Sequence, residues 1–207
     1  MNKNILSGNL HSVLIGIMLG DGHIYKTSPS SNSRFEMSFG KDRIHFAHWV
    51  GGLFSEYLSN DLKVIKYKTN NFFNSRFGFR LKTKTLPIFN YYHDIFYEAN
   101  NLTWKYKKIV PKNISELMDS TVLAYLIMSD GNFDKGRNRI RIYTNSYTKE
   151  EVTKLANVIN NNFNIYVGVL HDRKDQWILT IGKKQLDLLR ETVKHHFEPS
   201  MLYRLGL

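Results

Sequence analysis

Two aspartates, Asp21 and Asp130, stand at equivalent points of a motif that the chain carries twice, about half its length apart. Residues 14–22 read Leu-Ile-Gly-Ile-Met-Leu-Gly-Asp-Gly, and residues 123–131 read Leu-Ala-Tyr-Leu-Ile-Met-Ser-Asp-Gly. Each copy is an apolar run, typical of a buried helix, that ends in a small residue, an aspartate and a glycine. Two carboxylates brought together at such helix ends could hold divalent cations, and this arrangement suits the hydrolysis of phosphodiester bonds.

Small residues in both motifs predict that the two helices lie close together. Gly16, Gly20, Ala124 and Ser129 carry little side chain, so the helix backbones can approach each other. The aspartates at the helix ends would then repel each other and the negative end of each helix dipole, and divalent cations would offset that repulsion. A single Asp-Gly pair is more often only the end of a helix, whereas two copies at equivalent points favour a metal site.

The motifs belong to two longer repeats, each with the predicted order helix, hairpin, helix, hairpin, helix. The first repeat takes residues 1–100, the second takes residues 120–207, and a connector over residues 101–119 joins them. The sequence predicts strands near residues 34–40, 63–68, 75–83, 139–145, 165–171 and 176–182. Besides the motif helices, it predicts helices near residues 42–59, 85–98, 148–162 and 183–196, the third opened by a Thr148–Glu151 capping box. The predicted fold is therefore α+β, with two pseudo-symmetric αββαββα repeats and antiparallel sheets.

The predicted strands carry basic side chains on one face and apolar side chains on the other. In the second repeat, for example, Arg139 and Arg141 alternate with Ile140 and Ile142. A solvated face of an antiparallel sheet is the simpler interpretation. Basic residues recur on this face in both repeats and acidic residues are few, so contact with nucleic acid is favoured. A two-stranded ribbon fits the major groove of DNA. The residues expected to bind DNA are Arg34, Glu36, Ser38, Lys66, Lys68, Arg76, Arg80, Lys82, Arg137, Arg139, Arg141, Tyr143, Asn145, Arg173, Lys174 and Gln176.

Composition supports a polyanionic partner, because the formal net charge is +11 and the sequence pI is about 9.7. A membrane is disfavoured, since no apolar run approaches the length of a membrane span and the N-terminus lacks the pattern of a signal peptide. The absence of cysteine excludes disulfides, thiolate zinc sites and cysteine nucleophiles. The abundant residue types have AT-rich codons, which indicates an intracellular protein from an AT-rich genome, such as that of a mitochondrion or chloroplast.

The sequence resembles the LAGLIDADG homing endonucleases of the monomeric, two-motif kind. The motif matches are Leu14, Gly16, Asp21 and Gly22 in the first copy, and Leu123, Ala124, Leu126, Ile127, Asp130 and Gly131 in the second. Leu19 and Met128 replace the motif's earlier aspartate, and Tyr125 stands where glycine is usual. Residues 107–111 and 199–205 also resemble the enzymes encoded by fungal mitochondrial introns. The resemblance covers nearly the whole chain.

This resemblance implies a saddle of DNA-binding sheets and a double-strand DNA endonuclease that leaves short 3′ overhangs. Asp21 and Asp130 would be catalytic metal ligands, with the carbonyls of Gly20 and Ser129 as further oxygen ligands, and Mg²⁺ or another divalent cation such as Mn²⁺ would fit. Basic residues near the two scissile phosphates would be catalytic as well, and these are Lys108 and Arg204.

Two motifs in one chain predict a monomer, and two sheet halves of about one turn each predict an asymmetric duplex target of about 20 bp. One alternative is an RNA maturase or a DNA-binding protein of the same fold that does not cleave. A basic DNA-binding regulator is a further alternative, although no recognition helix stands out in the sequence.

Overall fold

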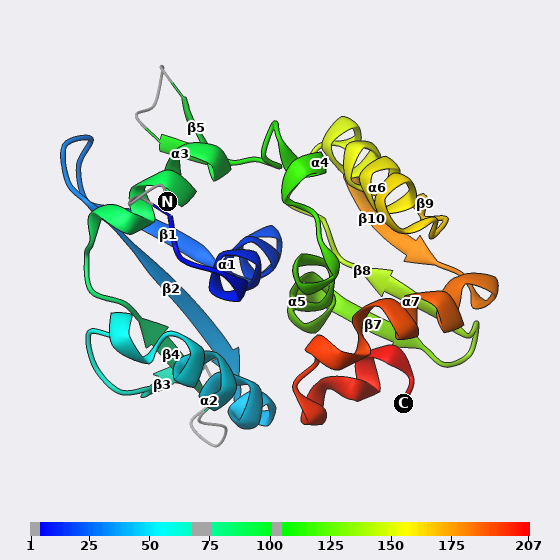
Figure 1. The fold of residues 1–207 in the computed structure, drawn as a ribbon, viewed down its shortest axis with the longest axis horizontal. Coiled ribbons are helices and arrows are strands. Elements are labelled where there is room, and N and C mark those ends of the chain that lie inside the picture. Colours follow the sequence, from blue (N-terminus) through cyan, green and yellow to red (C-terminus); the bar gives the residue numbers. More distant parts are fainter. Residues whose placement is uncertain (1–4, 68–75, 101–104) are drawn as a thin grey trace. The chain divides into compact units, whose positions relative to one another are not determined.

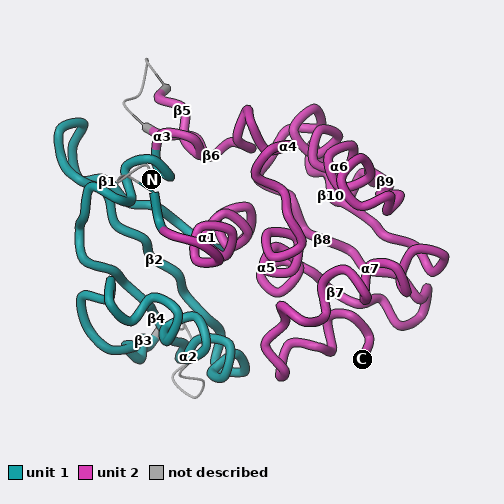
Figure 2. Tube along the Cα trace, in the orientation of Figure 1, with its two compact units in different colours: residues 1–6, 21–93 teal, residues 7–20, 94–207 magenta. Residues whose placement is uncertain are grey.

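Residues 5–67, 76–100 and 105–207 are described by a computed structural model, in which they form an α+β fold (Figure 1). Contacts divide the chain into two compact units (Figure 2). Unit 1 takes residues 1–6 and 21–93, and unit 2 takes residues 7–20 and 94–207. Among the described residues, no helix is long and apolar enough to cross a membrane.

Unit 1 is built around an antiparallel sheet of four strands, counted over its described residues, in the order β1-β2-β4-β3. Its elements in chain order are β1 (His23–Lys26), β2 (Ser33–Gly40), α2 (Ile44–Leu53), β3 (Lys63–Tyr67), β4 (Arg76–Lys82) and the first turn of α3 (Asn90–Phe96). Apolar side chains on one face of β2 are buried, and Phe39 meets Phe46 of α2 edge to face with ring centroids 5.7 Å apart. The opposite face of the sheet is thereby left to the polar side chains.

Unit 2 contains a second antiparallel sheet, again of four strands in the described part, in the order β7-β8-β10-β9. Its elements are α1 (Asn9–Leu19), β5 (Tyr97–Asn100), β6 (Lys105–Lys108), α4 (Ile114–Leu117), α5 (Ser120–Asp130), β7 (Gly131–Asp134), β8 (Arg139–Ile142), α6 (Lys149–Phe163), β9 (Gly168–Arg173), β10 (Gln176–Ile181) and α7 (Leu186–Val193). Ile140 and Ile142 are fully buried, and α6 packs against β9 and β10 (Figure 1). The predicted alternation along β8 is therefore confirmed.

Helix α6 shows how local sequence determines an element. The Thr148 side chain accepts a hydrogen bond from the Glu151 backbone N–H, and the Glu151 carboxylate accepts one from the Thr148 backbone N–H. This reciprocal capping box was predicted and satisfies two backbone donors at the start of the helix. The helix ends at Asn164, whose left-handed backbone (φ 57°) is a conformation that Asn tolerates.

Three predicted helices are shorter in the structure, and one of them, predicted over 183–196, forms α7 only at Leu186–Val193. The segment predicted as a helix over 42–59 forms α2 only at Ile44–Leu53, where Gly51 and Gly52 weaken its last turn. The segment predicted over 85–98 becomes helical in α3 and then turns into strand β5, which pairs with β6. Tyr97 ends the helix because its backbone hydrogen bonds go to this hairpin, which lies partly in the predicted connector. Residues 101–104 of that connector lie outside the described residues.

The compact units cross the repeat boundaries predicted from the sequence. Helix α1 belongs to the first repeat by sequence, yet it packs against α5 and therefore falls in unit 2 (Figure 2). Both helices are apolar over nearly their whole surface: residues Val13–Leu19 of α1 and Thr121–Ser129 of α5 are buried. Their mutual packing builds the core on which the candidate site rests.

Candidate functional site

The two motif helices approach each other closely because, at two points, glycine leaves no side chain between α1 and the neighbouring atoms of α5. A Cβ atom added at Gly16 would lie 2.5 Å from the Val122 carbonyl oxygen and 2.7 Å from Tyr125 Cβ. A Cβ atom added at Gly20 would lie 2.6 Å from Ser129 Cβ. Carbon atoms do not approach so closely, so only glycine permits this packing. The small residues therefore have the role that the sequence predicted, and Gly16 makes room for Tyr125.

Asp130 ends α5 at the same place where Gly20 ends α1. Its Oδ2 atom would lie 2.6 Å from a Cβ atom at Gly20, so the carboxylate rests against the Gly20 backbone. Asp130 is half-buried, and its carbonyl accepts a hydrogen bond of 3.0 Å from the Tyr143 backbone N–H. This contact joins the motif to β8. The carboxylate thus sits at the negative end of a helix dipole, which favours a cation beside it.

Asp21 is the first residue of unit 1 after Gly20, and the structure gives it a partner that the sequence did not suggest. Arg43, at the start of α2, donates a hydrogen bond of 3.1 Å from Nη1 to Asp21 Oδ2. Both side chains are about one-third exposed. The Asp21 carboxylate is therefore accessible, and its charge is balanced by a guanidinium of its own unit.

Each predicted catalytic cation lies at one motif. Lys108 Nζ donates a hydrogen bond of 2.7 Å to the Gly20 carbonyl oxygen, one of the predicted metal ligands. Arg204 Nη1 donates to the carbonyl of Gly131, the residue after Asp130. Lys108 is half-buried, whereas Arg204 is only 6% exposed. Unit 2 therefore brings Lys108 and Arg204 to the ends of α1 and α5, respectively.

A buried tyrosine completes this part of unit 2. Tyr147 donates a hydrogen bond of 3.1 Å from its hydroxyl to the Leu19 carbonyl oxygen at the end of α1. Burial, followed by the neighbouring Tyr97 and Asp130, raises the pKa of Tyr147 well above its usual value. The hydroxyl therefore keeps its proton and remains a hydrogen-bond donor at neutral pH.

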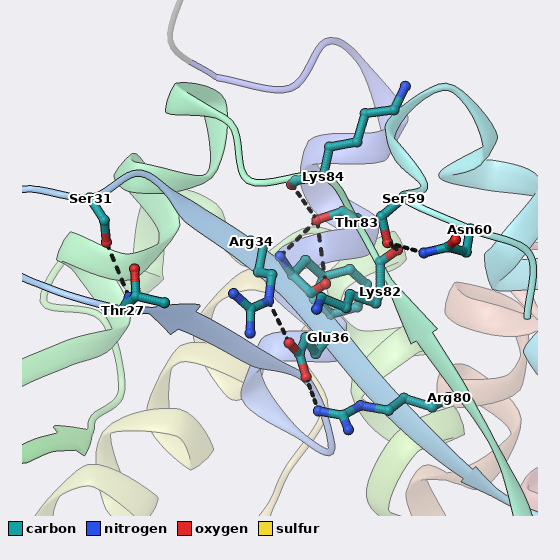
Figure 3. Close-up of polar contacts among 11 residues, drawn as sticks. Thr27, Ser31, Arg34, Glu36, Ser59, Asn60, Arg80, Lys82, Thr83 and Lys84 are labelled. Atoms are coloured by element: carbon teal, nitrogen blue, oxygen red, sulfur yellow. Dashed lines mark hydrogen bonds and ion pairs between the residues drawn. The ribbon is translucent and has the colours of Figure 1, made fainter. Parts of the chain in front are cut away.

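The polar face of the unit 1 sheet, here called face 1, collects predicted DNA-binding residues. Strand register sets Glu36 opposite Lys82 and Ser38 opposite Arg80, while Arg34 lies two residues before Glu36 on the same side of β2. Glu36 accepts hydrogen bonds from Arg34 Nε, at 2.6 Å, and from Arg80 Nη2 (Figure 3). Burial alone would raise the pKa of Glu36, but hydrogen bonds and charges from Arg34 and Arg80 lower it below 4.5.

Three other predicted residues of unit 1 do not join face 1. Lys66 pairs with Phe77 across β3 and β4, so it lies on the opposite face, with the apolar side chains. Lys63 takes its place on face 1, opposite Arg80. Lys68 lies outside the described residues. Arg76 is the first residue of β4, and its side chain is not among those described.

The polar face of the unit 2 sheet, here called face 2, carries a network in which carboxylates form ion pairs with the arginines. Arg139 Nε donates to Asp134 at 3.0 Å, a bond that lowers the pKa of Asp134. Arg141 Nη2 donates to Asp172 at 3.4 Å, and Asn145 Nδ2 donates to the same carboxylate at 3.1 Å. Predicted residues of both repeats are thus fixed in place by carboxylates before any ligand binds.

The other predicted residues of unit 2 surround this network. Gln176 Oε1 accepts hydrogen bonds from Asn145 Nδ2 and Arg173 Nε, both at 3.1 Å. Tyr143 is 37% exposed, with the Arg141 guanidinium 5.6 Å from its ring centroid. Arg137 and Lys174 lie exposed in the turns that follow β7 and β9. Face 2 therefore offers both fixed donors on the strands and exposed cations on the turns.

Residues 11–189 match the LAGLIDADG DNA endonuclease family, a span that includes both motifs and both four-stranded sheets. The chain belongs to this family.

Several known proteins resemble the chain over most of its length. The cytochrome b mRNA maturase bI2 of Saccharomyces cerevisiae is 27% identical, over 100% of this chain and 50% of that protein. The chain thus spans about half the length of that relative. The intron-encoded endonuclease ai4 of Dictyostelium discoideum is 30% identical, over 70% of this chain and 87% of that protein. The solved structure of the homing endonuclease I-WcaI bound to its DNA recognition sequence has a TM-score of 0.86 and 25% identity, covering 97% of this chain and 87% of that one.

These similarities confirm the α+β fold and the predicted membership of the LAGLIDADG family. Sequence reasoning nevertheless missed several residues at the site: Arg43, Lys63, Asp134, Tyr147 and Asp172. Among the strand residues, Asp134 carried a signal, because it lies opposite Arg139 in the β7–β8 hairpin. Arg43 and Tyr147 carried none, since their partners are distant in sequence.

Proposed function

We propose that the chain is a site-specific double-strand DNA endonuclease, a homing enzyme that hydrolyses one phosphodiester bond in each strand and leaves short 3′ overhangs. The contact between Gly20 and the Asp130 carboxylate carries this proposal. Asp21, the acidic residue of the first motif, follows Gly20 directly in the chain. A protein that only binds DNA gains nothing from carboxylates presented to phosphate. The acidic residues are explained if they act in cleavage.

The candidate ligands suit a hard divalent cation. The carboxylates of Asp21 and Asp130 and the carbonyls of Gly20 and Ser129 offer only oxygen, which Mg²⁺ and Mn²⁺ accept. The described residues contain no group of three or more histidines or acids that could cage a metal. This agrees with Mg²⁺, which is usually held by one or two carboxylates together with water and substrate phosphate. When bound, such a cation would activate water and stabilise the departing 3′ oxygen.

The two basic residues have different roles in this proposal. Lys108 is half-buried, and it reaches the end of α1 with an ammonium that can also approach a phosphate. It would stabilise the negative charge that grows on the phosphate in the transition state. Arg204 is buried against the Gly131 carbonyl, so it would hold the turn that orients Asp130. The burial of Arg204 thus favours a positioning role over direct contact with phosphate.

The sheet faces would bind the duplex. Face 1 presents arginines and lysines on antiparallel strands, face 2 presents arginines on its strands, and the net charge of the chain favours attraction to DNA. We propose an asymmetric duplex target of about 20 bp, recognised by a monomer that supplies both halves of the site. Light scattering of the protein on one such duplex should give one chain per duplex, and an obligate dimer would contradict this part of the proposal.

The relatives suggest where the protein acts. The intron-encoded endonuclease of Dictyostelium discoideum and the cytochrome b mRNA maturase of Saccharomyces cerevisiae are both similar to this chain. We propose that the chain is also intron-encoded and organellar, and that it promotes intron homing. The maturase is aligned over the whole chain, so RNA maturation is the second candidate function. In that case the protein would bind its intron RNA without cutting duplex DNA.

Cleavage of a library tests the leading function. Plasmids with random inserts would be incubated with the protein in Mg²⁺ or Mn²⁺, and the cut ends sequenced. A shared sequence of about 20 bp, cut in both strands with short 3′ overhangs, is the expected result. Binding to intron RNA without cleavage of any plasmid would favour the maturase.

A further inference from the structure

Face 1 contains a cavity of about 360 Å³ within unit 1. Figure 3 labels Arg34, Glu36, Arg80 and Lys82 among the residues that line the cavity. The cavity's lining residues come from strands β2, β3 and β4 and from the segment 59–61. The lining residues are Arg34, Glu36, Ser59, Asn60, Asp61, Lys63, Arg80 and Lys82. Basic and acidic side chains are therefore mixed in one hollow of the predicted DNA-binding surface.

Glu36 lines this cavity and bridges two arginines. Its side chain is only 8% exposed, and that of Arg34 is 17% exposed. Arg34 is fixed further by Tyr25, since its guanidinium carbon lies 4.2 Å from the centroid of that ring. Arg34 and Glu36 therefore form a rigid base, set by an ion pair of 2.6 Å and an aromatic contact.

Arg80 extends from this base toward solvent. It donates to Glu36 through one terminal nitrogen, Nη2, while half of its side chain remains exposed. A guanidinium anchored at one nitrogen is restricted in the direction of its other N–H groups. A planar fork of two N–H donors matches the O6 and N7 acceptors that guanine presents in the major groove. The guanidinium of Arg80 is thus oriented for bidentate contact with a guanine.

Four basic and two acidic side chains line the cavity, so its net charge is positive, but a phosphate at Arg80 would be repelled by the Glu36 carboxylate that Arg80 already binds. Glu36 and Asp61 both line the cavity, so a phosphate would face two carboxylates there. Glu36 also neutralises much of the charge that Arg80 would offer to a phosphate. The edge of a guanine is uncharged and needs directed donors rather than net positive charge. The lining therefore fits a base edge better than the DNA backbone.

We propose that this cavity recognises one guanine of the DNA target, with Arg80 as the base-contacting residue and Glu36, braced by Arg34, as its positioning residue. The proposal rests on the proposed function, because it assumes that face 1 lies in the major groove. It adds two things to that function: the identity of one recognised base, and a residue, Glu36, that affects base specificity without touching the DNA.

The test is to select the duplexes that the protein binds from a random library. Divalent cations are left out, so that no strand is cut. For the wild type, one G·C pair of the selected duplex should be required, and each replacement of it should weaken binding roughly 5- to 150-fold. Arg80→Lys keeps the positive charge but removes the planar fork. It should abolish the preference at that pair alone and leave the other positions unchanged. Unchanged preferences in Arg80→Lys, or an equal loss at every position, would overturn the proposal.

Glu36→Gln tests the positioning role with nearly the same side-chain volume. It should relax the preference at the same pair as Arg80→Lys, while affinity for unrelated duplex stays equal or rises because a negative charge is lost. Glu56→Gln is the matched control, since Glu56 is exposed in the turn Ser55–Tyr57 outside the cavity. It should keep every preference of the wild type, and relaxation at the same pair would contradict the inference.

The outcomes separate this inference from the proposed function. Circular dichroism would verify that each variant is folded, and if Glu36→Gln is not, Arg80→Lys carries the test. If the wild type selects no sequence at all, both the proposed function and this inference fail. If it selects a sequence but Arg80→Lys and Glu36→Gln select the same one with equal strength, only the guanine cavity fails.

Discussion

Gly20→Ala should damage both the packing of the motif helices and the chemistry at their ends. The added Cβ atom would lie 2.6 Å from Ser129 Cβ and 2.6 Å from Asp130 Oδ2, where carbon and oxygen atoms cannot remain. Because Ser129 is fully buried, α1 and α5 must separate to relieve the first contact. The second contact pushes the carboxylate itself away from its position.

The size of both effects follows from this geometry. Overpacking of a close-packed core costs about 1–3 kcal/mol. For a chain of this length, that corresponds to a fall of roughly 2–12 °C in melting temperature. Displacement of a catalytic group by about 1 Å can lower the rate about 100-fold. Most of the Gly20→Ala protein would still be folded at 25 °C. Its cleavage rate should therefore fall far more than its loss of folding stability alone would explain.

Two other glycines provide matched controls. Gly16→Ala brings a Cβ atom to 2.5 Å from the Val122 carbonyl oxygen, an equally severe contact that does not involve Asp130. Gly52→Ala, in α2, meets nothing within 4 Å and should raise stability by about 0.5–1 kcal/mol. Thermal unfolding and single-turnover cleavage would be measured for all three. Equal cleavage rates for folded Gly20→Ala and wild type would refute the reasoning.

Two further predictions concern DNA binding and alkaline stability. Arg139→Ala and Arg141→Ala, on face 2, should each weaken binding to the selected duplex more than Lys149→Ala. Lys149 lies on α6, and its ammonium is 4.6 Å from the ring centroid of Trp177 on β10. Equal losses in a gel-shift titration would argue against face 2 as a DNA-binding surface. Tyr147→Phe should cost about 1–2 kcal/mol by removing the bond to Leu19. Because burial raises the pKa of Tyr147, its contribution is fully present below the usual value of 10.0 and declines as the pH rises above it. Thermal unfolding between pH 7 and pH 11 should therefore show a smaller alkaline decline in Tyr147→Phe than in the wild type.

The sequence predicted the parts of the fold that depend on local pattern. The apolar motifs gave α1 and α5, the alternation of arginine with isoleucine gave β8, and Thr148 with Glu151 gave the start of α6. Each of these signals lies within a few neighbouring residues, where helix capping and strand alternation are decided. The small residues of the motifs also predicted close helix packing, because backbone approach depends directly on side-chain size.

The features that the sequence could not predict depend on distant partners. Lys66 and Lys63 differ only in which side of β3 they occupy, and this follows from the register with β4 rather than from β3 itself. Arg43 meets Asp21 only after α2 has packed on its sheet. Asp172 meets Arg141 across strands that are not neighbours in sequence. Asp172 was therefore missed, although it orients an arginine that the pattern predicted, whereas Glu36 of face 1 was among the predicted DNA-binding residues.

Cleavage by aspartate variants tests the central claim most directly. Asp21→Asn and Asp130→Asn keep the side-chain shape but remove a charge that would hold the cation. A supercoiled plasmid with the selected target would be incubated with each variant in Mg²⁺, and a gel-shift titration would follow binding to the same target. Asp187→Asn is the control, since its side chain is 93% exposed on α7.

Either motif variant should lose double-strand cleavage and retain specific binding, while Asp187→Asn should cut like the wild type. Nicking of one strand can persist in a single variant, because Lys108 and Arg204 make the two half-sites chemically different. Wild-type cleavage by both Asp21→Asn and Asp130→Asn, or failure of the wild type to cut its selected target in Mg²⁺ or Mn²⁺, would contradict the claim that this chain is a DNA endonuclease acting through its two motif aspartates.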